Sequence, residues 1–467
     1  MSSLHIDLPK GIETILTTLH QAGFEAVLVG GCVRDALMDR RPHDFDIATS
    51  ATPQQVQALF THTVPVGIAH GTVLVLEKGA QAEVTTFRKE SEYEDFRHPK
   101  QVEFVEDLTQ DLARRDFTIN AMAWSMDKGL IDPFHGQDDL KKGLIRTVGD
   151  PNIRFQEDAL RILRAFRFMG RFGFDMEEKT REAIEKQAVL IEHLAAERVA
   201  AEIQDILATS PQVLDDMTDV LKPWLPELDQ MEKVEQNSVY HYTDVFHHTL
   251  DALKAMPYFD PSIAWALLLH DSGKIKAHQF YDGHDHFKGH PECSVELARE
   301  AFKRLKLSKK VSDEALKLIK LHDTFYAPRL GNLYKLRVRH GLDDELVQKL
   351  FVVQYCDIMA HAQHDRLEKL KNFYYFYEAE KDKHPFSRKD LKIHGQDVTD
   401  NTTLQGAQIA KSLDALLKEV IEQPKLDSKK EQLAWIKAHE AEFLQSPVHP
   451  LKAKTIKKGK KTKKNEV

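Results

Sequence analysis

The chain has 467 residues, 42% of them hydrophobic and 30% charged, with a formal net charge of −8. This length exceeds the size at which one compact core is usual, so we expect several domains. The longest apolar runs, such as residues 264–269, are far shorter than the roughly 20 residues that cross a bilayer, and the N-terminus has no secretory pattern, so we expect a cytoplasmic protein without a membrane span.

Short β-rich runs mark the first third of the chain. They lie at residues 26–29, 45–48, 72–76 and 82–87, and a turn-like sequence at 77–80 separates the last two. This pattern predicts a small mixed α/β domain over residues 1–150.

Two glycines follow the first predicted strand, in the sequence Val29-Gly30-Gly31-Cys32-Val33-Arg34. A strand that runs into glycines and then into a helix lets the backbone approach a phosphate closely, and Arg34 supplies a counter-charge. A glycine pair after a strand is usually only a turn, so this motif gains weight only from its neighbours.

Some ten residues downstream lies the sequence Asp44-Phe45-Asp46-Ile47. Side chains alternate in an extended segment, so Asp44 and Asp46 are expected on one face and the two apolar residues in the core. Two carboxylates that share a site need a cation, and Mg²⁺ bound together with substrate phosphates suits oxygen ligands. A lone pair of this kind is more often a solvated turn, but beside the glycine motif it predicts a metal-dependent phosphate site.

From about Pro151 the apolar spacing becomes helical, and we expect mostly helix for the remainder. Asp158, Arg161, Arg164 and Arg167 are spaced by three and are predicted to form a polar stripe on one helix. Carboxylate acceptors beside guanidinium donors match the hydrogen-bonding edge of a nucleotide base. In isolation this block is typical of a salt-bridged helix surface; together with the earlier motifs it indicates base selection.

A second chemical centre is predicted between residues 240 and 365. Its histidines and aspartates occur in the order H…HD…H…H…D, as His248, His270, Asp271, His290, His322 and Asp357. Imidazole and carboxylate are suitable ligands for divalent metals such as Mn, Fe or Ni. His284 and His286 are alternative ligands in the same segment.

Together these motifs resemble those of the nucleotidyltransferase superfamily related to DNA polymerase β, and within it the class II group of tRNA nucleotidyltransferases and bacterial poly(A) polymerases. Residues 70–73 and 83–88 resemble a hairpin that completes the catalytic sheet, and residues 93–99 resemble the flexible loop of enzymes that build a whole CCA end. Residues 114–121 are similar to the family's sugar- and phosphate-contacting motif. Residues 195–203 resemble its last shared motif, which we interpret as a structural support for the base-reading helix.

The resemblance implies a role for each of these residues. Asp44 and Asp46 are the implied catalytic carboxylates and Mg²⁺ ligands, with Glu83 as a candidate third. The implied nucleotide-binding residues are Gly31, Arg34, Arg115, Asp158, Arg161, Arg164 and Arg167. Asp158 and Arg161 are the pair expected to read the incoming C or A.

The histidine-rich segment resembles an HD metal-dependent phosphohydrolase, which implies a divalent transition metal and activity on phosphate esters such as 2′,3′-cyclic phosphate ends. The expected architecture is multi-domain α+β, with a small mixed α/β nucleotidyltransferase head followed by predominantly helical parts. These are a neck at 151–230, an HD body at 231–370, a C-terminal tRNA-binding domain at 371–450 and a lysine-rich tail at 451–467. The tail carries eight lysines and one glutamate, and contact with phosphate or simple solubilisation explains it equally well.

We therefore expect template-independent addition of C, C and A to the 3′ end of tRNA from CTP and ATP. The alternatives are a poly(A) polymerase and an enzyme that adds only CC or only A. A further alternative, from another class of enzyme, is an HD phosphohydrolase whose head only binds RNA. Both Asp44 and Asp46 are present, which argues against that last alternative.

Overall fold

A computed structural model describes residues 4, 6–42, 44–68, 71–90, 102–237, 242–423 and 425–445. The chain divides into two compact units, one of residues 1–322 with 356–363 and the other of residues 323–355 with 364–467. No helix among the described residues is both long enough and apolar enough to cross a membrane.

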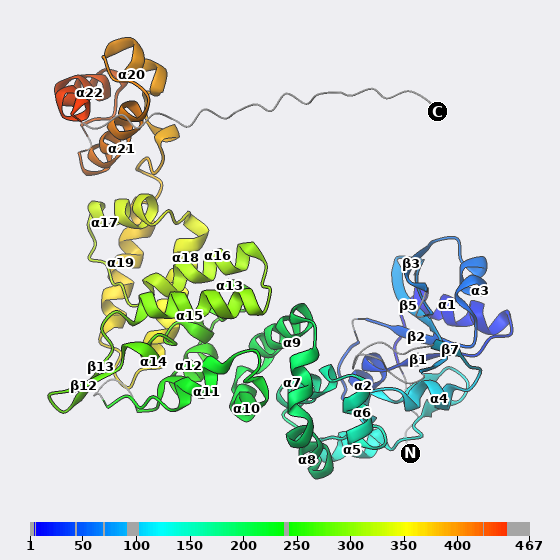
Figure 1. The fold of residues 1–467 in the computed structure, drawn as a ribbon. Coiled ribbons are helices and arrows are strands. Elements are labelled where there is room, and N and C mark those ends of the chain that lie inside the picture. The colour runs from blue at the N-terminus through cyan, green and yellow to red at the C-terminus, as the bar shows by residue number, and fades with distance from the viewer. Residues whose placement is uncertain are drawn as a thin grey trace, which may run out of the picture. The chain divides into compact units, whose positions relative to one another are not determined.

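A seven-stranded mixed sheet forms the centre of the head, in the order β3-β4-β5-β2-β1-β8-β9 (Figure 1). The strands are β1 (Ala26–Val29), β2 (Asp46–Thr49), β3 (Thr63–Gly67), β4 (Thr72–Glu77), β5 (Ala80–Thr86), β8 (Ala123–Ser125) and β9 (Gly129–Ile131). Only β2 and β5 are parallel neighbours; the other pairs are antiparallel. The expected hairpin is β4–β5, and its turn falls at Lys78 and Gly79, which both have positive φ.

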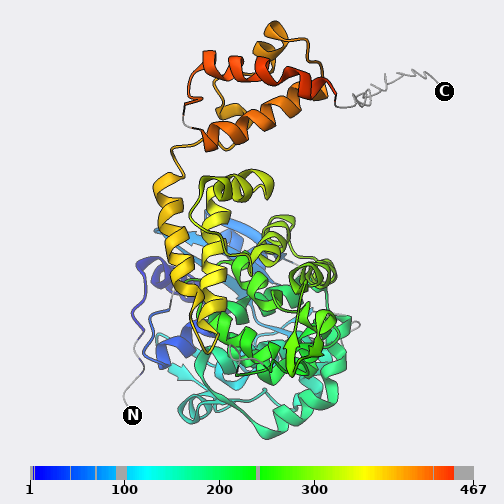
Figure 2. The ribbon, with the colours of Figure 1, turned by 90° about the vertical axis from the view of Figure 1, so that its left-hand side faces the viewer.

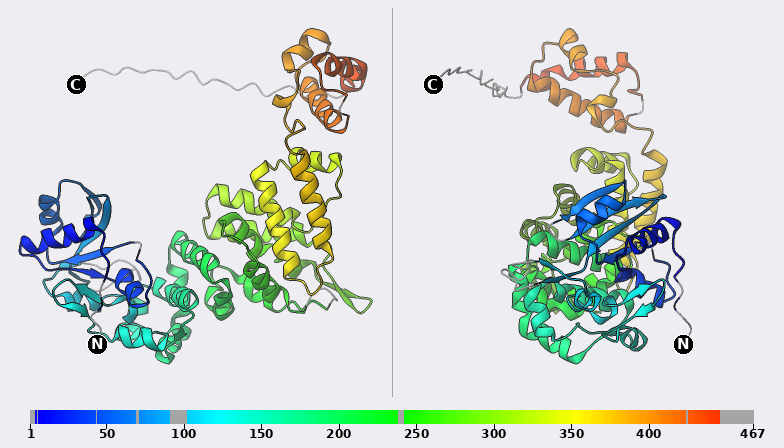
Figure 3. Two further views of the ribbon diagram at one scale, coloured as in Figure 1. Left: turned by 180° about the vertical axis from the view of Figure 1, so that it is seen from behind. Right: turned by 90° about the vertical axis from the view of Figure 1, so that its right-hand side faces the viewer.

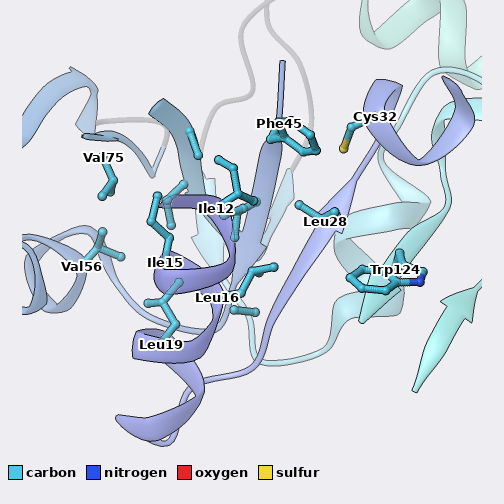
Figure 4. Packing of buried hydrophobic residues seen from close by; sticks show 14 of the residues in the cluster. Ile12, Ile15, Leu16, Leu19, Leu28, Cys32, Phe45, Val56, Val75 and Trp124 are labelled. Carbon is cyan, nitrogen blue, oxygen red and sulfur yellow. The ribbon is translucent and has the colours of Figure 1, made fainter. Parts of the chain in front are cut away.

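Helices cover both faces of this sheet. The apolar residues of α1 (Lys10–Gln21) recur every three or four positions, so Ile12, Ile15 and Leu19 share one face and are buried on the sheet (Figure 4). On the opposite face, α4 (Leu108–Ala113) contributes to a second apolar cluster with strand residues. Every residue of β1 is therefore buried.

The remaining head elements are short. They are α2 (Gly31–Leu37), α3 (Pro53–Leu59), α5 (Gly136–Lys142) and the antiparallel pair β6 (Arg88–Glu90) and β7 (Val102–Phe104). Thr52 caps α3 in a capping box with Gln55, and Pro53 occupies the first turn, which fixes where this helix begins.

The neck consists of helices from Pro151 onward. They are α6 (Pro151–Glu157), α7 (Leu160–Phe172), α8 (Glu178–Gln187), α9 (Ala196–Thr209), α10 (Thr218–Leu221) and α11 (Pro226–Glu232). The mixed head and helical remainder confirm the expected fold class. Two short strand pairs are also present, β10 (Leu144–Ile145) with β11 (Asp175–Met176) and β12 (Gln279–Tyr281) with β13 (His284–His286). Of these, β11, β12 and β13 lie in the region that was predicted to be mostly helical.

The histidine-rich segment begins with α12 (Val245–Lys254), which Asp244 caps, and α13 (Pro261–Leu269), which Asp260 caps. The other helices that contribute to it are α14 (Lys274–Ala277), α15 (His290–Arg304), α16 (Lys309–Leu321) and the end of α18 (Asp344–Met359). The β12–β13 hairpin turns at Asp282 and Gly283, both with positive φ (Figure 3). Residues 262–269 of α13 are all buried, so this helix forms the core on which the others pack.

The second unit is helical. It contains α17 (Leu330–Tyr334), a π-helical turn at Lys335–Arg339, most of α18, α19 (Arg366–Glu380), α20 (Gly395–Asn401), α21 (Ala407–Glu422) and α22 (Lys429–Leu444). Within it α18 and α19 lie side by side, with the rings of Phe351 and Tyr377 5.7 Å apart (Figure 2). Helices α20, α21 and α22 enclose an apolar core that includes Val398, Leu416 and Ile436.

Candidate functional site

The acidic edge of the head lies at the start of β2. Phe45 lies in the apolar core (Figure 4). Ile47 is buried too, whereas Asp44 and Asp46 are exposed, as the predicted alternation requires. The parallel register of β2 with β5 pairs Asp46 with Glu83, which is also exposed. Three carboxylates therefore lie together where β2 begins beside β5, and we call this group the acidic edge of the head.

Electrostatics at this edge reflect that crowding. Loss of hydration raises the pKa of Asp46, Arg115 opposes the shift, and the charges of Glu83 and Asp44 add to it. Within the described part of the chain, these acids do not form a set of three whose ligand atoms all lie within 4.8 Å of one another. The edge is thus an open group of carboxylates rather than a closed metal cage.

The glycine motif lies next to Arg115. Gly30 has a φ of 72° and precedes α2, and a Cβ at this position would lie 3.0 Å from Nη1 of Arg115. Arg115 is held by Asp111, whose Oδ2 is 3.3 Å from Nη2. A side chain at residue 30 would therefore crowd the arginine that also acts on Asp46.

Arg34 is turned into the protein. Its Nη1 donates to Oδ1 of Asn120 at 2.6 Å, its Nη2 lies 2.7 Å from Asp35, and its guanidinium lies over the ring of Phe172. Burial lowers the pKa of this arginine, although Asp35 opposes the shift. The predicted contact of Arg34 with a triphosphate stays a prediction, because its described partners are protein groups.

The base-reading block differs from the sequence prediction in one respect. Asp158 is not on the helix: α6 ends at Glu157, α7 begins at Leu160, and Asp158 is extended between them. Its Oδ1 accepts a hydrogen bond from the amide of Leu160 at 3.1 Å, as aspartates do at helix starts. The predicted stripe is therefore an aspartate at the head of α7 and three arginines on the helix.

The three arginines make different contacts. Arg161 is buried, its Nη1 donating to Glu157 at 2.7 Å and its Nη2 to the carbonyl of Arg114 at 2.9 Å. Arg164 pairs with Asp116 at 2.7 Å, and Arg167 pairs with Glu202 at 2.6 Å.

Sequence reasoning missed the pairing of Asp116 with Arg164, whereas the pair of Arg167 with Glu202 agrees with the support expected from residues 195–203. Asp116 is buried, yet its pKa falls to about 2, since Arg164 and the amides of Asn120 and Phe117 outweigh the cost of burial. Because Asn120 also accepts from Arg34, residues from α2, the 114–121 segment and α7 form one network. No local signal indicates these pairings, since their members are 48 and 86 positions apart.

The predicted loop at 93–99, His70 and the lysine-rich tail lie outside the described residues. The six histidine and aspartate positions predicted downstream, by contrast, come together in one buried cluster. Its members are His248, His270, Asp271, His290, His322 and Asp357. His284 and His286 lie on β13 and are not in this cluster.

The cluster has two halves that meet at Asp271. One oxygen, Oδ2, lies 3.6 Å from Nε2 of His248 and 3.4 Å from Nε2 of His270. The other oxygen, Oδ1, lies 3.3 Å from Nε2 of His290 and 3.5 Å from Nε2 of His322. Asp357 completes the first half, with Oδ1 3.0 Å from Nε2 of His248.

The cluster fits divalent cations. In His270, His290 and His322 the Nδ1–H donates to the backbone carbonyl three residues earlier, which leaves Nε2 as the lone-pair nitrogen of the neutral ring. Nε2 of His270 is buried without a hydrogen-bond partner among the described residues. Such orientation by backbone acceptors is typical of metal-binding histidines.

Two nearby residues were not predicted. Nζ of Lys274 lies 2.7 Å from Oδ2 of Asp271 and 2.6 Å from Oε1 of Gln236. Burial would raise the pKa of Asp271, but the charges of Lys274 and His270 outweigh it, so this pKa lies well below its usual value. The ring of His361 lies 5.0 Å from that of His248 and is tilted against it by 44°, and burial lowers the pKa of His361 to about 4.

Models of known protein families match the head, the neck and the histidine-rich segment of the chain. A model of the poly A polymerase head domain matches residues 26–146, a model of the probable RNA- and SrmB-binding site of polymerase A matches 173–231, and an HD domain model matches 243–357. Over these segments the chain is similar to the poly A polymerase head, its RNA-binding region and the HD domain. The acidic edge and the HD cluster thus fall within segments that family models match.

Individual relatives agree with that placement. A CCA-adding enzyme of Anoxybacillus flavithermus is 54% identical over 194 residues, which are 42% of this chain and 49% of the relative. One of Bacillus cereus is 46% identical over 246 residues, 52% of this chain and 62% of the relative. The chain therefore spans only half to three fifths of the length of these curated relatives.

Among solved structures, a Bacillus stearothermophilus CCA-adding enzyme in complex with CTP is similar with a TM-score of 0.68 and 28% identity. That match covers 93% of this chain and 98% of the other. A Thermotoga maritima CCA-adding enzyme complexed with tRNA has a TM-score of 0.52 at 22% identity, over 91% of this chain and 94% of the other, and this likeness concerns the fold alone.

Proposed function

We propose that this protein adds C, C and A to the 3′ end of tRNA, using CTP and ATP without a nucleic-acid template. The observation that carries the proposal is the placement of Asp158 and Arg161 at the start of α7, where protein contacts fix each side chain. The relatives that are named CCA-adding enzymes support the same substrates.

Base chemistry explains why this pair suits C and A. Cytosine and adenine carry an exocyclic amine, which donates hydrogen bonds, where uracil and guanine carry a carbonyl, which only accepts them. A carboxylate accepts from the amine and repels the carbonyl, and a guanidinium donates to the neighbouring ring nitrogen. Asp158 and Arg161 together therefore favour the two bases of the CCA end.

The phosphate side of the reaction is assigned to the acidic edge. We assign the nucleotide contact to Arg115, which lies next to Gly30, and Asp44 and Asp46 are the residues that would hold Mg²⁺, with Glu83 as a candidate third. Divalent ions at such sites stabilise the attacking and leaving oxygens of phosphoryl transfer. Arg34, Arg164 and Arg167 are assigned to organising this region, in keeping with their ion pairs, and their direct contact with nucleotide stays part of the proposal.

The decisive experiment supplies labelled CTP and ATP, separately and together, to tRNA transcripts that lack all, one or none of the terminal nucleotides. Ordered addition of C, C and A followed by a stop is the expected result. Long runs of A on any RNA would instead identify a poly(A) polymerase, and addition that halts after CC, or that needs a CC end, would identify a partial enzyme.

A second function is proposed for the HD cluster, because Asp271 faces two sets of histidines through its two oxygens. His248, His270, Asp271 and Asp357 would hold one divalent ion, and Asp271, His290 and His322 another. Such ions act as Lewis acids toward phosphate esters. We propose a phosphohydrolase here, and a transition metal is the better fit because imidazole dominates the ligands.

The HD proposal is tested with RNA that ends in a 2′,3′-cyclic phosphate. His270→Ala is expected to abolish its hydrolysis and to leave C addition to an intact acceptor unchanged. Equal hydrolysis by this variant and the unaltered protein would rule out the cluster as the site.

A further inference from the structure

Arg198 lies in the first turn of α9, forty residues after Asp158 in the sequence. Its Nη2 lies 3.0 Å from Oδ2 of Asp158. The other carboxylate oxygen already accepts from the amide of Leu160. Asp158 is therefore fixed at both oxygens, by the helix that follows it and by a neighbouring helix.

The same guanidinium has a donor to spare. Nη1 of Arg198 is buried without a hydrogen-bond partner among the described residues. A buried donor left unpaired costs free energy, and native structures rarely keep one unless another group fills it. Because protein atoms enclose Nη1, a bound base does not reach it, and the contact of this guanidinium that bears on the base is the one with Asp158.

We propose that Arg198 sets the base selectivity of nucleotide addition by holding the Asp158 carboxylate in one orientation. This inference rests on the proposed function and deepens it, since it names a residue on which selectivity depends. Arg198 acts through Asp158, so it is a positioning residue.

Orientation matters because selectivity depends on which group Asp158 presents. A fixed, ionised carboxylate presents only acceptors and rejects the carbonyl of uracil or guanine. A carboxylate that is free to rotate loses that discrimination, because its acceptor oxygens no longer face one fixed position on the base. Arg161 is held by Glu157 and by two backbone carbonyls, so the loss of Arg198 would leave it in place.

A structural tie between α7 and α9 is the competing explanation. These helices also share the pair of Arg167 with Glu202, so the neck keeps a second polar link without Arg198. A purely structural role would lower the activity with every nucleotide by the same factor. A selectivity role changes the ratio between nucleotides.

The experiment measures kcat/KM for single additions of CTP, ATP, UTP and GTP to a tRNA transcript that lacks CCA, for the unaltered protein and for Arg198→Ala and Arg198→Lys. Arg181→Ala, which removes an exposed arginine of α8, is the matched control. In Arg198→Ala we expect the preference for CTP over UTP to fall by about tenfold to a hundredfold, as for the loss of a charged hydrogen bond. Arg198→Lys should recover part of it.

Binding without chemistry gives a second readout. The ratio of Kd for UTP to Kd for CTP, measured without RNA, should fall in Arg198→Ala and stay unchanged in Arg181→Ala. An unchanged ratio in both assays, with a uniform loss of activity or a lowered Tm, would overturn the inference and leave the proposed function intact. If the unaltered protein shows no preference for C and A over U and G, the proposed function itself fails, and this inference with it.

Discussion

The acidic edge of the head and the HD cluster both gather carboxylates, but they are built in opposite ways. Asp44, Asp46 and Glu83 are exposed, and they form no closed set of three ligand atoms among the described residues. In the HD cluster every ligand is buried, and three imidazoles are already oriented by backbone carbonyls. One site is incomplete by itself, and the other is complete without a substrate.

This difference indicates two modes of metal use. Mg²⁺ keeps much of its water and commonly binds through one or two carboxylates together with substrate phosphates, so an open edge suits an ion that arrives with a nucleotide. A buried set of imidazoles and carboxylates suits a resident ion whose ligands are all protein groups. We therefore expect the head to need added metal and nucleotide, and the HD cluster to retain its metal through purification.

The largest effect is expected from Asp46→Asn in the head. Removing one charge from the open edge takes away a ligand that nothing else replaces, so C addition should fall by about a thousandfold or more. Single-turnover addition to tRNA lacking CCA measures it, and filter binding should show tRNA affinity within about twofold of normal. Asp138→Asn, at an exposed carboxylate of α5, is the matched control, and substantial activity in Asp46→Asn would refute the assignment.

The metal content of the purified protein tests whether the HD cluster holds resident ions. Elemental analysis of purified protein should give about two transition-metal ions per chain, about one after His290→Ala, and almost none after Asp271→Asn, which removes the shared ligand. His284→Ala, outside the cluster, should keep the full content. If His290→Ala retains both ions, the division of the cluster into two halves is wrong.

Much of both centres could be predicted from the sequence because their patterns are local. The alternation from Asp44 to Ile47 follows from strand geometry, and it is confirmed. The sequence predicted which residues are the HD ligands. It did not predict that the two oxygens of Asp271 face two different pairs of histidines, because the ligands come from separate helices.

The rest depends on tertiary contacts. Asp158 was predicted on the helix, but it lies before the helix, and its side chain accepts from the amide of Leu160, the first residue of α7. The pairs of Arg164 with Asp116 and of Arg198 with Asp158 join residues 48 and 40 positions apart. The spacing of apolar residues does not identify such ion pairs, because a charged residue outside the apolar face could equally point into solvent.

The pair of buried Asp116 and partly buried Arg164 tests whether the structure behind the acidic edge is rigid. The pKa of Asp116 is lowered to about 2 from an ordinary 3.8, so its charge contributes about 2 kcal/mol of stability at neutral pH. Because the folded value is depressed, that stability is complete above pH 3.8 and is lost as the pH falls toward about 2. Asp116→Asn should lower hydrogen-exchange protection of residues 117–124 by about thirtyfold at pH 7.

The same exchange measurement at pH 3 should show a smaller difference between Asp116→Asn and the unaltered protein. Asp127→Asn provides the comparison, because Asp127 lies in the head but is exposed. An equal difference at both pH values would mean that the amide disturbs packing, and that the charge of Asp116 is not what holds Arg164.

Glu83 is expected to give the smallest effect and to define how open the edge is. Asp46 and Glu83 are register partners on parallel strands, so Glu83→Gln should reduce C addition by about tenfold if it completes the metal site, roughly the worth of one weak ligand contact. The apparent affinity for Mg²⁺ should fall by a similar factor, which titration of the addition rate with Mg²⁺ would measure. Gln81→Ala, an exposed neighbour on β5, controls for disturbance of the strand. An unchanged Mg²⁺ dependence in Glu83→Gln would leave Asp44 and Asp46 as the protein ligands of the head, and it would make the contrast with the six-residue HD cluster still sharper.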